Sequence, residues 1–150
     1  MSTPVIPSLK QMPTDFLFCD LSQLINDPDA WTDRRFYTSS LPRYELPGFD
    51  RQWDIPMLLR LRREAERGVN LILWTNRPDY SAMRAEIQKL ADASAVGWSK
   101  IMLRPVWAAG DEATFKVSVV KALVPDYRTK VTFLDREDIK NVLSSGFRRS

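Results

Sequence analysis

Polar side chains follow three apolar runs of the sequence. The run "FLFC" leads onto Asp20, "LILW" leads onto Thr75 and Arg77, and "VTFL" leads onto Asp135. Carboxylates supply the hard oxygen ligands that Mg²⁺ prefers, and a hydroxyl and a guanidinium can hold the oxygens of an anion. These residue types suit phosphoryl transfer, in which stabilising charge on the transferring group does most of the work.

The absence of histidine from the sequence limits the available chemistry. It excludes Ser-His-Asp and Cys-His nucleophile systems and imidazole metal ligands. The single cysteine, Cys19, cannot form an internal disulfide or a thiolate zinc site, and we expect it to be a small buried hydrophobic residue. Any catalysis must therefore use carboxylates, Lys, Arg, Tyr and hydroxyl groups, and any metal would need oxygen ligands, which favours Mg²⁺.

The composition is that of one soluble globular domain. The chain has 150 residues, of which 44% are hydrophobic and 27% are charged. Neither a membrane span nor a secretion signal is visible, so we expect a cytoplasmic protein with no membrane contact. The net charge of +3 and the clustered arginines suit a phosphate-bearing partner. For the run from Arg60 to Arg67, a solvated helix face is the simpler interpretation.

Strands and helices are expected to alternate along the chain. Residues 1–13 read as a loose arm, residues 14–150 as a single domain, and residues 26–53 as a long irregular insertion that is rich in aromatic side chains. The expected strands are 15–19, 69–74, 100–105 and 130–134, with "TNRPDY" as a loop, and the expected helices are 54–68, 81–93, 113–124 and 137–146, the last closed by Gly146. This order predicts an α/β, Rossmann-like fold with a mostly parallel sheet, in which ligands bind at the carboxyl ends of the strands.

Several segments resemble the motifs of the haloacid-dehalogenase-like (HAD) phosphatase superfamily. They are "FLFCDLSQLIND", "LILWTNRP" and "VTFLDREDIKNVLSSG", in that order. Through "TDRRFY", "WDIP", "IMLRP" and "VVKALV", the chain more closely resembles the 3′-phosphatase domain of bacteriophage polynucleotide kinase–phosphatases. The resemblance covers roughly residues 16–146. It implies a HAD fold and a Mg²⁺-dependent phosphomonoesterase that acts on nucleotide or polynucleotide phosphate ends, through an aspartyl-phosphate, in the cytoplasm of a phage host.

The resemblance also implies roles for individual residues. Asp20 would be the nucleophile and a Mg²⁺ ligand, Asp135 the distal metal ligand, and Ser22 would offer its backbone carbonyl to the metal. Thr75 and Arg77 would bind the phosphoryl oxygens. Arg34, with Arg35 as its alternative, would reach the substrate phosphate. Lys121, with Lys116 as the competing lysine, would neutralise Asp20 and the incoming phosphoryl group.

The chain departs from the family pattern at several of these positions. The family has D-x-D-G-T where this chain has "DLSQL", so Ser22 replaces the Asp that acts as general acid. A hydroxyl does not donate a proton at neutral pH, and losing a general acid typically costs about 10²–10⁴ in rate. Leu134 replaces one Asp of the last motif, and Val117 stands where the family has an Asp one helical turn before the lysine. These departures favour an alternative function: a catalytically inactive HAD-like protein that binds nucleic acid or a host protein.

Structural alternatives remain open for most candidates. Asp135 with Asp138 could cap a helix, "TNRP" could be a turn set by Pro78, and the stem of Lys121 could pack against the valines of its helix. Trp31, Trp53 and Trp107 are candidates for stacking on nucleic-acid bases, although aromatic side chains in a small domain more often belong to the core.

Overall fold

The computed structural model describes residues 15–24, 53–124 and 129–148. The arm at 1–13 and nearly all of the insertion at 26–53 lie outside these ranges. The described elements are β1 (Phe16–Asp20), η1 (Leu21–Leu24), α4 (Ile55–Glu66), β2 (Asn70–Pro78), α5 (Ser81–Ser94), β3 (Lys100–Arg104), α6 (Glu112–Leu123), β4 (Val131–Leu134) and α7 (Glu137–Arg148). The predicted alternation of strands and helices is confirmed.

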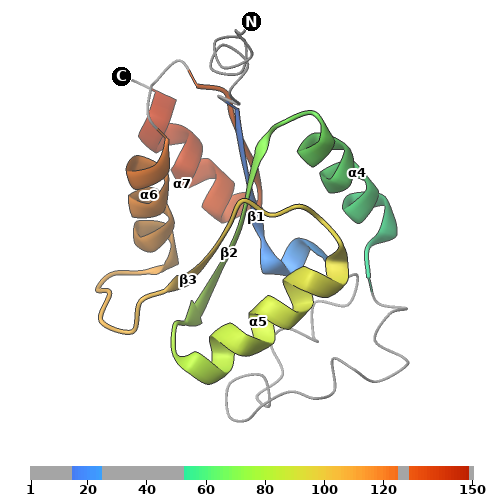
Figure 1. Cartoon of the computed structure of the whole chain (residues 1–150). Coiled ribbons are helices and arrows are strands. Elements are labelled where there is room, and N and C mark those ends of the chain that lie inside the picture. Colours follow the sequence, from blue (N-terminus) through green and yellow to red (C-terminus); the bar gives the residue numbers. More distant parts are fainter. Residues whose placement is uncertain (1–14, 25–52, 125–128, 149–150) are drawn as a thin grey trace, which may run out of the picture.

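Within the described residues, four strands form one parallel sheet in the order β3-β2-β1-β4. Helices α4 and α5 cover one face of the sheet, and α6 and α7 cover the other (Figure 1). The fold is therefore the predicted α/β, Rossmann-like arrangement. The chain passes outward from β1 to β2 and β3 and then returns to place β4 on the other side of β1. This reversal makes the carboxyl ends of β1 and β4 a topological switch point, the position at which ligands bind in open α/β sheets.

The alternation of side chains along the strands decides where the strand-end acids lie. Leu17 and Cys19 of β1 pack into the apolar cluster under α4 and α5, whereas Phe18 packs into the cluster under α6 and α7. Because side chains in a strand alternate between faces, Asp20 continues the face of Phe18, and Asp135 likewise continues the face of Phe133. Both acids are thus directed to the side of the sheet that α6 covers.

Helix α4 begins at an acidic N-cap, and one arginine of the run that was expected to be solvated anchors it to α5. The carboxylate of Asp54 accepts a hydrogen bond from the backbone N–H of Met57 at 3.1 Å, as an N-cap does. Arg62 donates to the backbone carbonyl of Ser94 at 2.7 Å and so ties α4 to the end of α5. The other arginines of the run are exposed, which confirms the solvated face for Arg60, Arg63 and Arg67.

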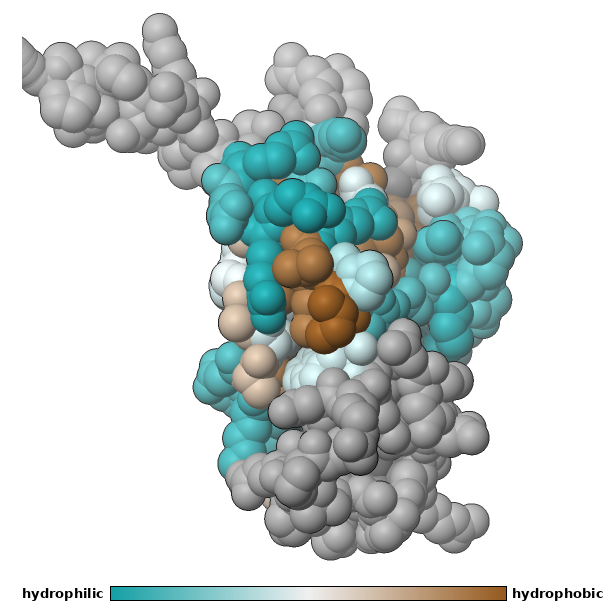
Figure 2. Space-filling view, turned by 90° about the vertical axis from the view of Figure 1, so that its right-hand side faces the viewer, coloured by the Kyte–Doolittle hydropathy of each residue, from teal (hydrophilic) through white to brown (hydrophobic). Residues whose placement is uncertain are grey.

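A small apolar patch lies among hydrophilic side chains on the side of the molecule that carries α4 (Figure 2). The large exposed hydrophobic residues of this helix are Ile55 and Leu59, which are one turn apart. Within the described part of the chain, no helix is both long enough and apolar enough to cross a bilayer.

Two predicted boundaries are wrong. Strand β2 continues through "TNRP" to Pro78, because it keeps pairing with β3 across an irregularity between Thr75 and Pro78. Asp79 then donates its backbone N–H to the carbonyl of Arg104 at 2.8 Å, which extends the association of the two strands. Helix α7 runs past Gly146 instead of ending there, since a glycine near a helix end costs only about 1 kcal/mol.

Candidate functional site

A fully buried lysine, Lys116 of α6, binds three carboxylates. Its Nζ lies 2.6 Å from Oδ1 of Asp20, 2.7 Å from Oδ2 of Asp135 and 2.7 Å from Oε2 of Glu112. Its side chain is 0% exposed, and those of Asp20 and Asp135 are 8% and 0% exposed. Three chain segments, the end of β1, the first turns of α6 and the end of β4, therefore meet beyond the carboxyl ends of β1 and β4.

The remaining oxygens of the two strand-end acids also accept hydrogen bonds from the protein. Asp20 Oδ2 accepts from the backbone N–H of Ser22 at 3.0 Å and from its hydroxyl at 2.5 Å. Asp135 Oδ1 accepts from the backbone N–H of Arg136 at 2.7 Å, and Asp135 Oδ2 accepts from the indole N–H of Trp74 at 3.0 Å. The position of each carboxylate is thereby fixed from two sides.

The local sequence of α6 explains how Lys116 and Glu112 come to share one face. The helix begins at Asp111, whose carboxylate accepts the backbone N–H of Thr114 at 2.9 Å as an N-cap. Glu112 lies in the first turn and Lys116 follows four residues later, the spacing at which side chains of a helix are neighbours. Arg136 holds the other oxygen of Glu112 at 2.7 Å. The acid is therefore oriented by two cations.

An aromatic stack supports the buried ammonium from the sheet side. The ring of Trp74 lies 4.6 Å from the ring of Phe18 and is nearly parallel to that of Phe133, at 6.2 Å. Nζ of Lys116 lies 5.2 Å from the centroid of the Trp74 ring, within the range of a cation–π interaction. Trp74 therefore contacts both the cation and, through its N–H, the acid Asp135.

The charges of the cluster are strongly coupled. Burial alone lowers the pKa of Lys116, but attraction by Asp20 and Asp135 and their hydrogen bonds outweigh it, and the pKa is raised. Burial and the negative charge of Asp20 raise the pKa of Asp135. Burial also acts to raise the pKa of Glu112, but hydrogen bonds from Arg136 and Lys116 prevail and leave it lowered. Fully ionised, the three carboxylates outnumber the two cations that hold them, so these five groups together carry one net negative charge.

Burial also keeps the neighbouring thiol inert. It raises the pKa of Cys19 well above the ordinary value, and the charges of Asp20 and Asp135 add to the effect. Since the thiolate is the reactive form, Cys19 is a structural residue, as its sequence context predicts.

The raised pKa of Lys116 leads to a prediction for alkaline solution. A group that binds its proton more tightly in the folded state contributes stability that is complete below its ordinary pKa of 10.5 and is lost as the pH rises through the folded-state pKa. We expect the free energy of unfolding of the wild type to approach that of Lys116→Met only above pH 10.5. Urea titrations over a pH series, without added metal, measure this gap; a gap that stays constant into strong alkali would contradict the prediction.

The structure corrects the choice between the two candidate lysines. Lys121, which the resemblance favoured, is exposed, and the competing Lys116 occupies the position beside Asp20. Five residues along an α-helix turn the side-chain direction by about 140°, so the two lysines cannot reach the same point. With Lys116 as the lysine, the residue one turn earlier is Glu112 and not Val117, and an acid is present there after all.

Glu112, Trp74 and Arg136 were not found by sequence reasoning. The spacing of Glu112 and Lys116 is a recognisable signal for a pair on one helix face. The other two give no such signal, because Trp74 sits in an apolar run and Arg136 in a charged one.

The other candidate residues lie in four places: near the carboxyl end of β2, on the surface, in the core, or outside the described residues. Thr75 and Arg77 are buried at the end of β2, where the hydroxyl oxygen of Thr75 accepts the backbone N–H of Arg77 at 3.2 Å. Asp138 is exposed and pairs with Arg136 at 3.4 Å, on the solvent side of the buried acids that bind Lys116. Trp53 is buried in the core, as the structural alternative predicts. Arg34, Arg35 and Trp31 fall outside the described residues.

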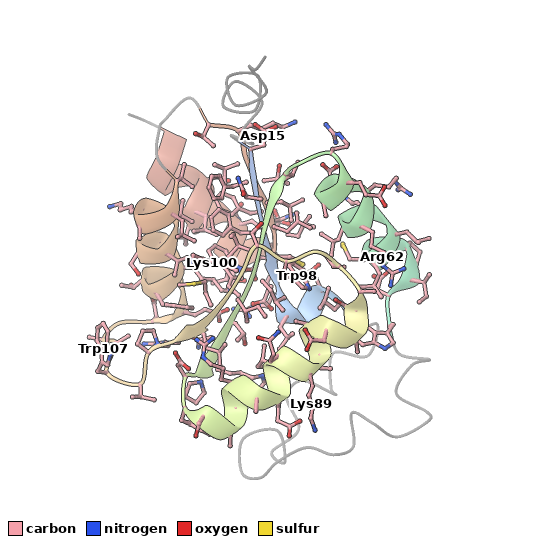
Figure 3. The ribbon with its side chains drawn as sticks, viewed as in Figure 1. Asp15, Arg62, Lys89, Trp98, Lys100 and Trp107 are labelled. Atoms are coloured by element: carbon pink, nitrogen blue, oxygen red, sulfur yellow. The ribbon has the colours of Figure 1, made fainter. Side chains whose placement is uncertain are left out.

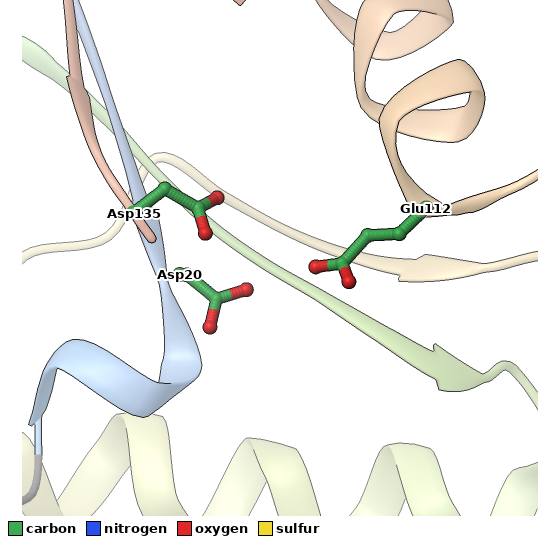
Figure 4. A group of neighbouring side chains, drawn as sticks. All are labelled: Asp20, Glu112 and Asp135. Carbon is green, nitrogen blue, oxygen red and sulfur yellow. The ribbon is translucent and has the colours of Figure 1, made fainter. Parts of the chain in front are cut away.

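The donor set fits a hard divalent cation. Asp20, Glu112 and Asp135 each offer one carboxylate oxygen, and these atoms lie within 4.8 Å of one another. Opposite ligands of an octahedral Mg²⁺ ion are about 4 Å apart, so the donor types and the spacing suit the ion. Nζ of Lys116 already lies 2.6–2.7 Å from the same three carboxylates, so an ion would have to use lone pairs that the ammonium leaves free or displace it. Figure 4 shows the two strand-end acids facing Glu112, which comes from the start of α6.

Comparison with known proteins places the chain by its fold. No protein-family model matches it, and neither does any curated protein sequence. One similar chain belongs to the structure of the Pnkp1/Rnl/Hen1 complex, with a TM-score of 0.64 and 16% identity over 90% of this chain. Another belongs to the structure of the Pnkp1/Rnl/Hen1 RNA repair complex, with a TM-score of 0.60 and 16% identity over 91% of this chain. The likeness is one of fold. This chain spans 43% and 40% of the length of those two chains, and the relation that the likeness supports is distant.

Proposed function

We propose that this chain is a Mg²⁺-dependent phosphomonoesterase that acts on nucleotide or polynucleotide phosphate ends, with Asp20 as the nucleophile. The observation that carries the proposal is the meeting of Asp20, Asp135 and Lys116 beyond the carboxyl ends of β1 and β4. A nucleophilic carboxylate needs a fixed position and a neighbouring positive charge, and the hydrogen bonds from Ser22 and Lys116 to Asp20 supply both. The carboxylates of Asp135 and Glu112 would add the oxygen donors that a metal ion needs.

The chemical steps require little more than these groups. An oxygen of Asp20 attacks phosphorus, the bond from phosphorus to the leaving oxygen breaks, and an aspartyl-phosphate forms. Lys116, 2.6 Å from Asp20, offsets the negative charge that gathers as the phosphoryl group approaches. Water then attacks the aspartyl-phosphate, which releases inorganic phosphate and regenerates the carboxylate. Thr75 and Arg77 are suited to hold the phosphoryl oxygens from the end of β2.

The acids that would hold Mg²⁺ are Asp20 and Asp135, with the backbone carbonyl of Ser22 and the carboxylate of Glu112 as further oxygen donors. When bound, the ion supplies positive charge that stabilises the phosphoryl oxygens in the transition state. The excess of carboxylates over cations in the cluster favours such an ion.

A nucleic-acid end is the substrate that best agrees with the rest of the molecule. One of the two structural neighbours belongs to an RNA repair complex. The chain carries a net charge of +3, and the candidate phosphate contacts, Arg77 and either Arg34 or Arg35, are guanidinium groups, which bind phosphate in a bidentate manner.

The direct test is phosphate release by the wild-type chain. We expect Mg²⁺-dependent release from an activated aryl phosphate and, more slowly, from a 3′-phosphorylated oligonucleotide, because only the first leaving group departs readily without a proton. No release from either substrate at saturating Mg²⁺ would refute the proposal.

Restoring an acid at residue 22 should raise activity on the poorer leaving group. Ser22 lies 2.5 Å from Asp20 through its hydroxyl, so a carboxylic acid at this position is next to the nucleophile and can protonate the departing oxygen. We expect Ser22→Asp to accelerate oligonucleotide dephosphorylation by about 10²-fold or more and aryl phosphate hydrolysis much less. Comparing the two substrates by steady-state kinetics checks this. Equal effects on both substrates would show that the proton is not what limits the wild type.

A second candidate is a protein that binds a nucleic-acid end or a host protein without turnover. The specific observation in its favour is that all four oxygens of Asp20 and Asp135 already accept hydrogen bonds from the protein, as a purely structural ion-pair network requires. This candidate predicts salt-sensitive binding of nucleic acid, or a stable protein partner, that Asp20→Asn leaves unchanged.

A further inference from the structure

A tight turn between β3 and α6 presents an exposed tryptophan. Trp107 is 82% exposed and its neighbour Val106 is 66% exposed. Figure 3 shows Trp107 on the connection between β3 and α6. The backbone N–H of Ala108 donates to the carbonyl of Pro105 at 3.0 Å, which closes a four-residue turn with Val106 and Trp107 at its tip. The other tryptophans of the described residues are buried or half-buried, so this one stands apart.

The turn is held in place by one arginine. Nη1 of Arg104 donates to the side-chain oxygen of Asn76 on β2 at 2.9 Å, and its Nη2 donates to the backbone carbonyls of Ala108 and Gly110. Gly110 has φ of +89°, a conformation that favours glycine, and leads directly into the N-cap of α6. A ring carried on a braced turn loses little conformational freedom when a ligand stacks on it.

The turn leads into the candidate site. It leaves the carboxyl end of β3, the edge at which Asp20 and Asp135 also lie, and it enters the helix that supplies Glu112 and Lys116. Trp107 and Glu112 are five residues apart, so their Cα atoms are at most about 18 Å from each other. A short stretch of single strand can therefore contact the turn while its end reaches the acids.

We infer that the turn formed by Val106 and Trp107 is a stacking platform for a base of single-stranded nucleic acid whose phosphate end enters the Asp20 cluster. This inference rests on the proposed function and names how its substrate is held. Two apolar side chains are too few for the core of a protein–protein interface, but one aromatic face is enough to stack a base, and the guanidinium of Arg104 lies beside it. Stacking on an aromatic side chain is tolerant of sequence, so the platform should bind any base.

Binding of a single-stranded oligonucleotide that ends in a 3′-hydroxyl tests the platform apart from catalysis, because this probe cannot be dephosphorylated. We expect Trp107→Ala to raise the dissociation constant by about 5- to 150-fold, the usual effect of removing one base stack, and Trp107→Phe to raise it much less. Leu59→Ala, which truncates an exposed apolar residue of α4, is the matched control and should bind like the wild type. Fluorescence anisotropy of the labelled oligonucleotide at one fixed salt concentration measures all four proteins.

The outcomes separate this inference from the proposed function. Equal dissociation constants for the wild type and Trp107→Ala would overturn the platform, as would a wild type that binds no oligonucleotide. A change of oligomeric state in Trp107→Ala with unchanged oligonucleotide binding would also overturn it, because the ring would then serve self-association. Hydrolysis of an aryl phosphate by the wild type tests the proposed function by itself. If the wild type does not hydrolyse the aryl phosphate but Trp107→Ala still binds the oligonucleotide more weakly than the wild type, the proposed function is wrong and the stacking platform is supported.

Discussion

Replacing Asp20 by Asn is expected to lower phosphate release by about 10⁴-fold or more, as the loss of a catalytic nucleophile does in other enzymes. The amide cannot form an aspartyl-phosphate, and the variant has nearly the same shape as the wild type. Its single carbonyl oxygen can accept from either Lys116 or Ser22, where the carboxylate of Asp20 accepts from both. The effect on activity should therefore far exceed the effect on folding.

Single-turnover release of phosphate from an aryl phosphate at saturating Mg²⁺ measures this loss, and circular dichroism monitors the fold. The matched control is Asp92→Asn, which removes the charge of an exposed acid of α5 whose carboxylate accepts a hydrogen bond from Gln88 at 3.0 Å. We expect the control to keep wild-type activity. The loss of a nucleophile usually costs far more than a factor of about ten in rate. If Asp20→Asn kept about a tenth of the wild-type rate, the nucleophile would therefore be another group.

The ends of β1 and β4 could be predicted because local sequence decides them, whereas β2 continues past its predicted end to Pro78. An apolar run of four residues followed by a polar one is the pattern of a buried parallel strand that reaches the edge of its sheet. That pattern placed Asp20 and Asp135 at one edge, and the structure joins both to Lys116 there. Thr75 follows Trp74, the β2 residue that pairs with Asp20, although its strand continues to Pro78. Parallel strands share a direction, so no knowledge of tertiary contacts was needed to bring these residues close.

The lysine could not be predicted, because the phase of α6 depends on what the helix packs against. The resemblance favoured Lys121 because of "VVKALV", and the neighbouring valines offered only a packing role for its stem. A lysine inside the buried stripe is improbable by hydrophobicity alone. The structure buries Lys116 between Phe115 and Val119 instead. Three carboxylates from other parts of the chain stabilise its charge there. A hydrophobicity pattern assigns charged residues to the surface, so it cannot identify a buried lysine whose charge is stabilised by carboxylates from distant parts of the chain.

Replacing Lys116 by Met is expected to destabilise the fold by about 3–5 kcal/mol in the absence of metal, the usual cost of removing one partner of a buried ion pair. Methionine fills much of the same space, but Asp20, Asp135 and Glu112 then face one another without the ammonium that lies 2.6–2.7 Å from each. Lys121→Met makes the same substitution five residues later on the exposed side of α6. It should change stability by less than about 0.5 kcal/mol.

Mg²⁺ should recover part of the stability that Lys116→Met loses, because a ligand that binds only the folded state stabilises it and the ion can take the place of the missing charge. Urea titrations of wild type, Lys116→Met and Lys121→Met, each with a chelator and with Mg²⁺, measure the effect. We expect the gain from Mg²⁺ to be larger in Lys116→Met than in the other two proteins. If Mg²⁺ stabilises none of the three, the carboxylates form a structural ion-pair network and not a metal site. The binding protein without turnover then becomes the better account of this chain.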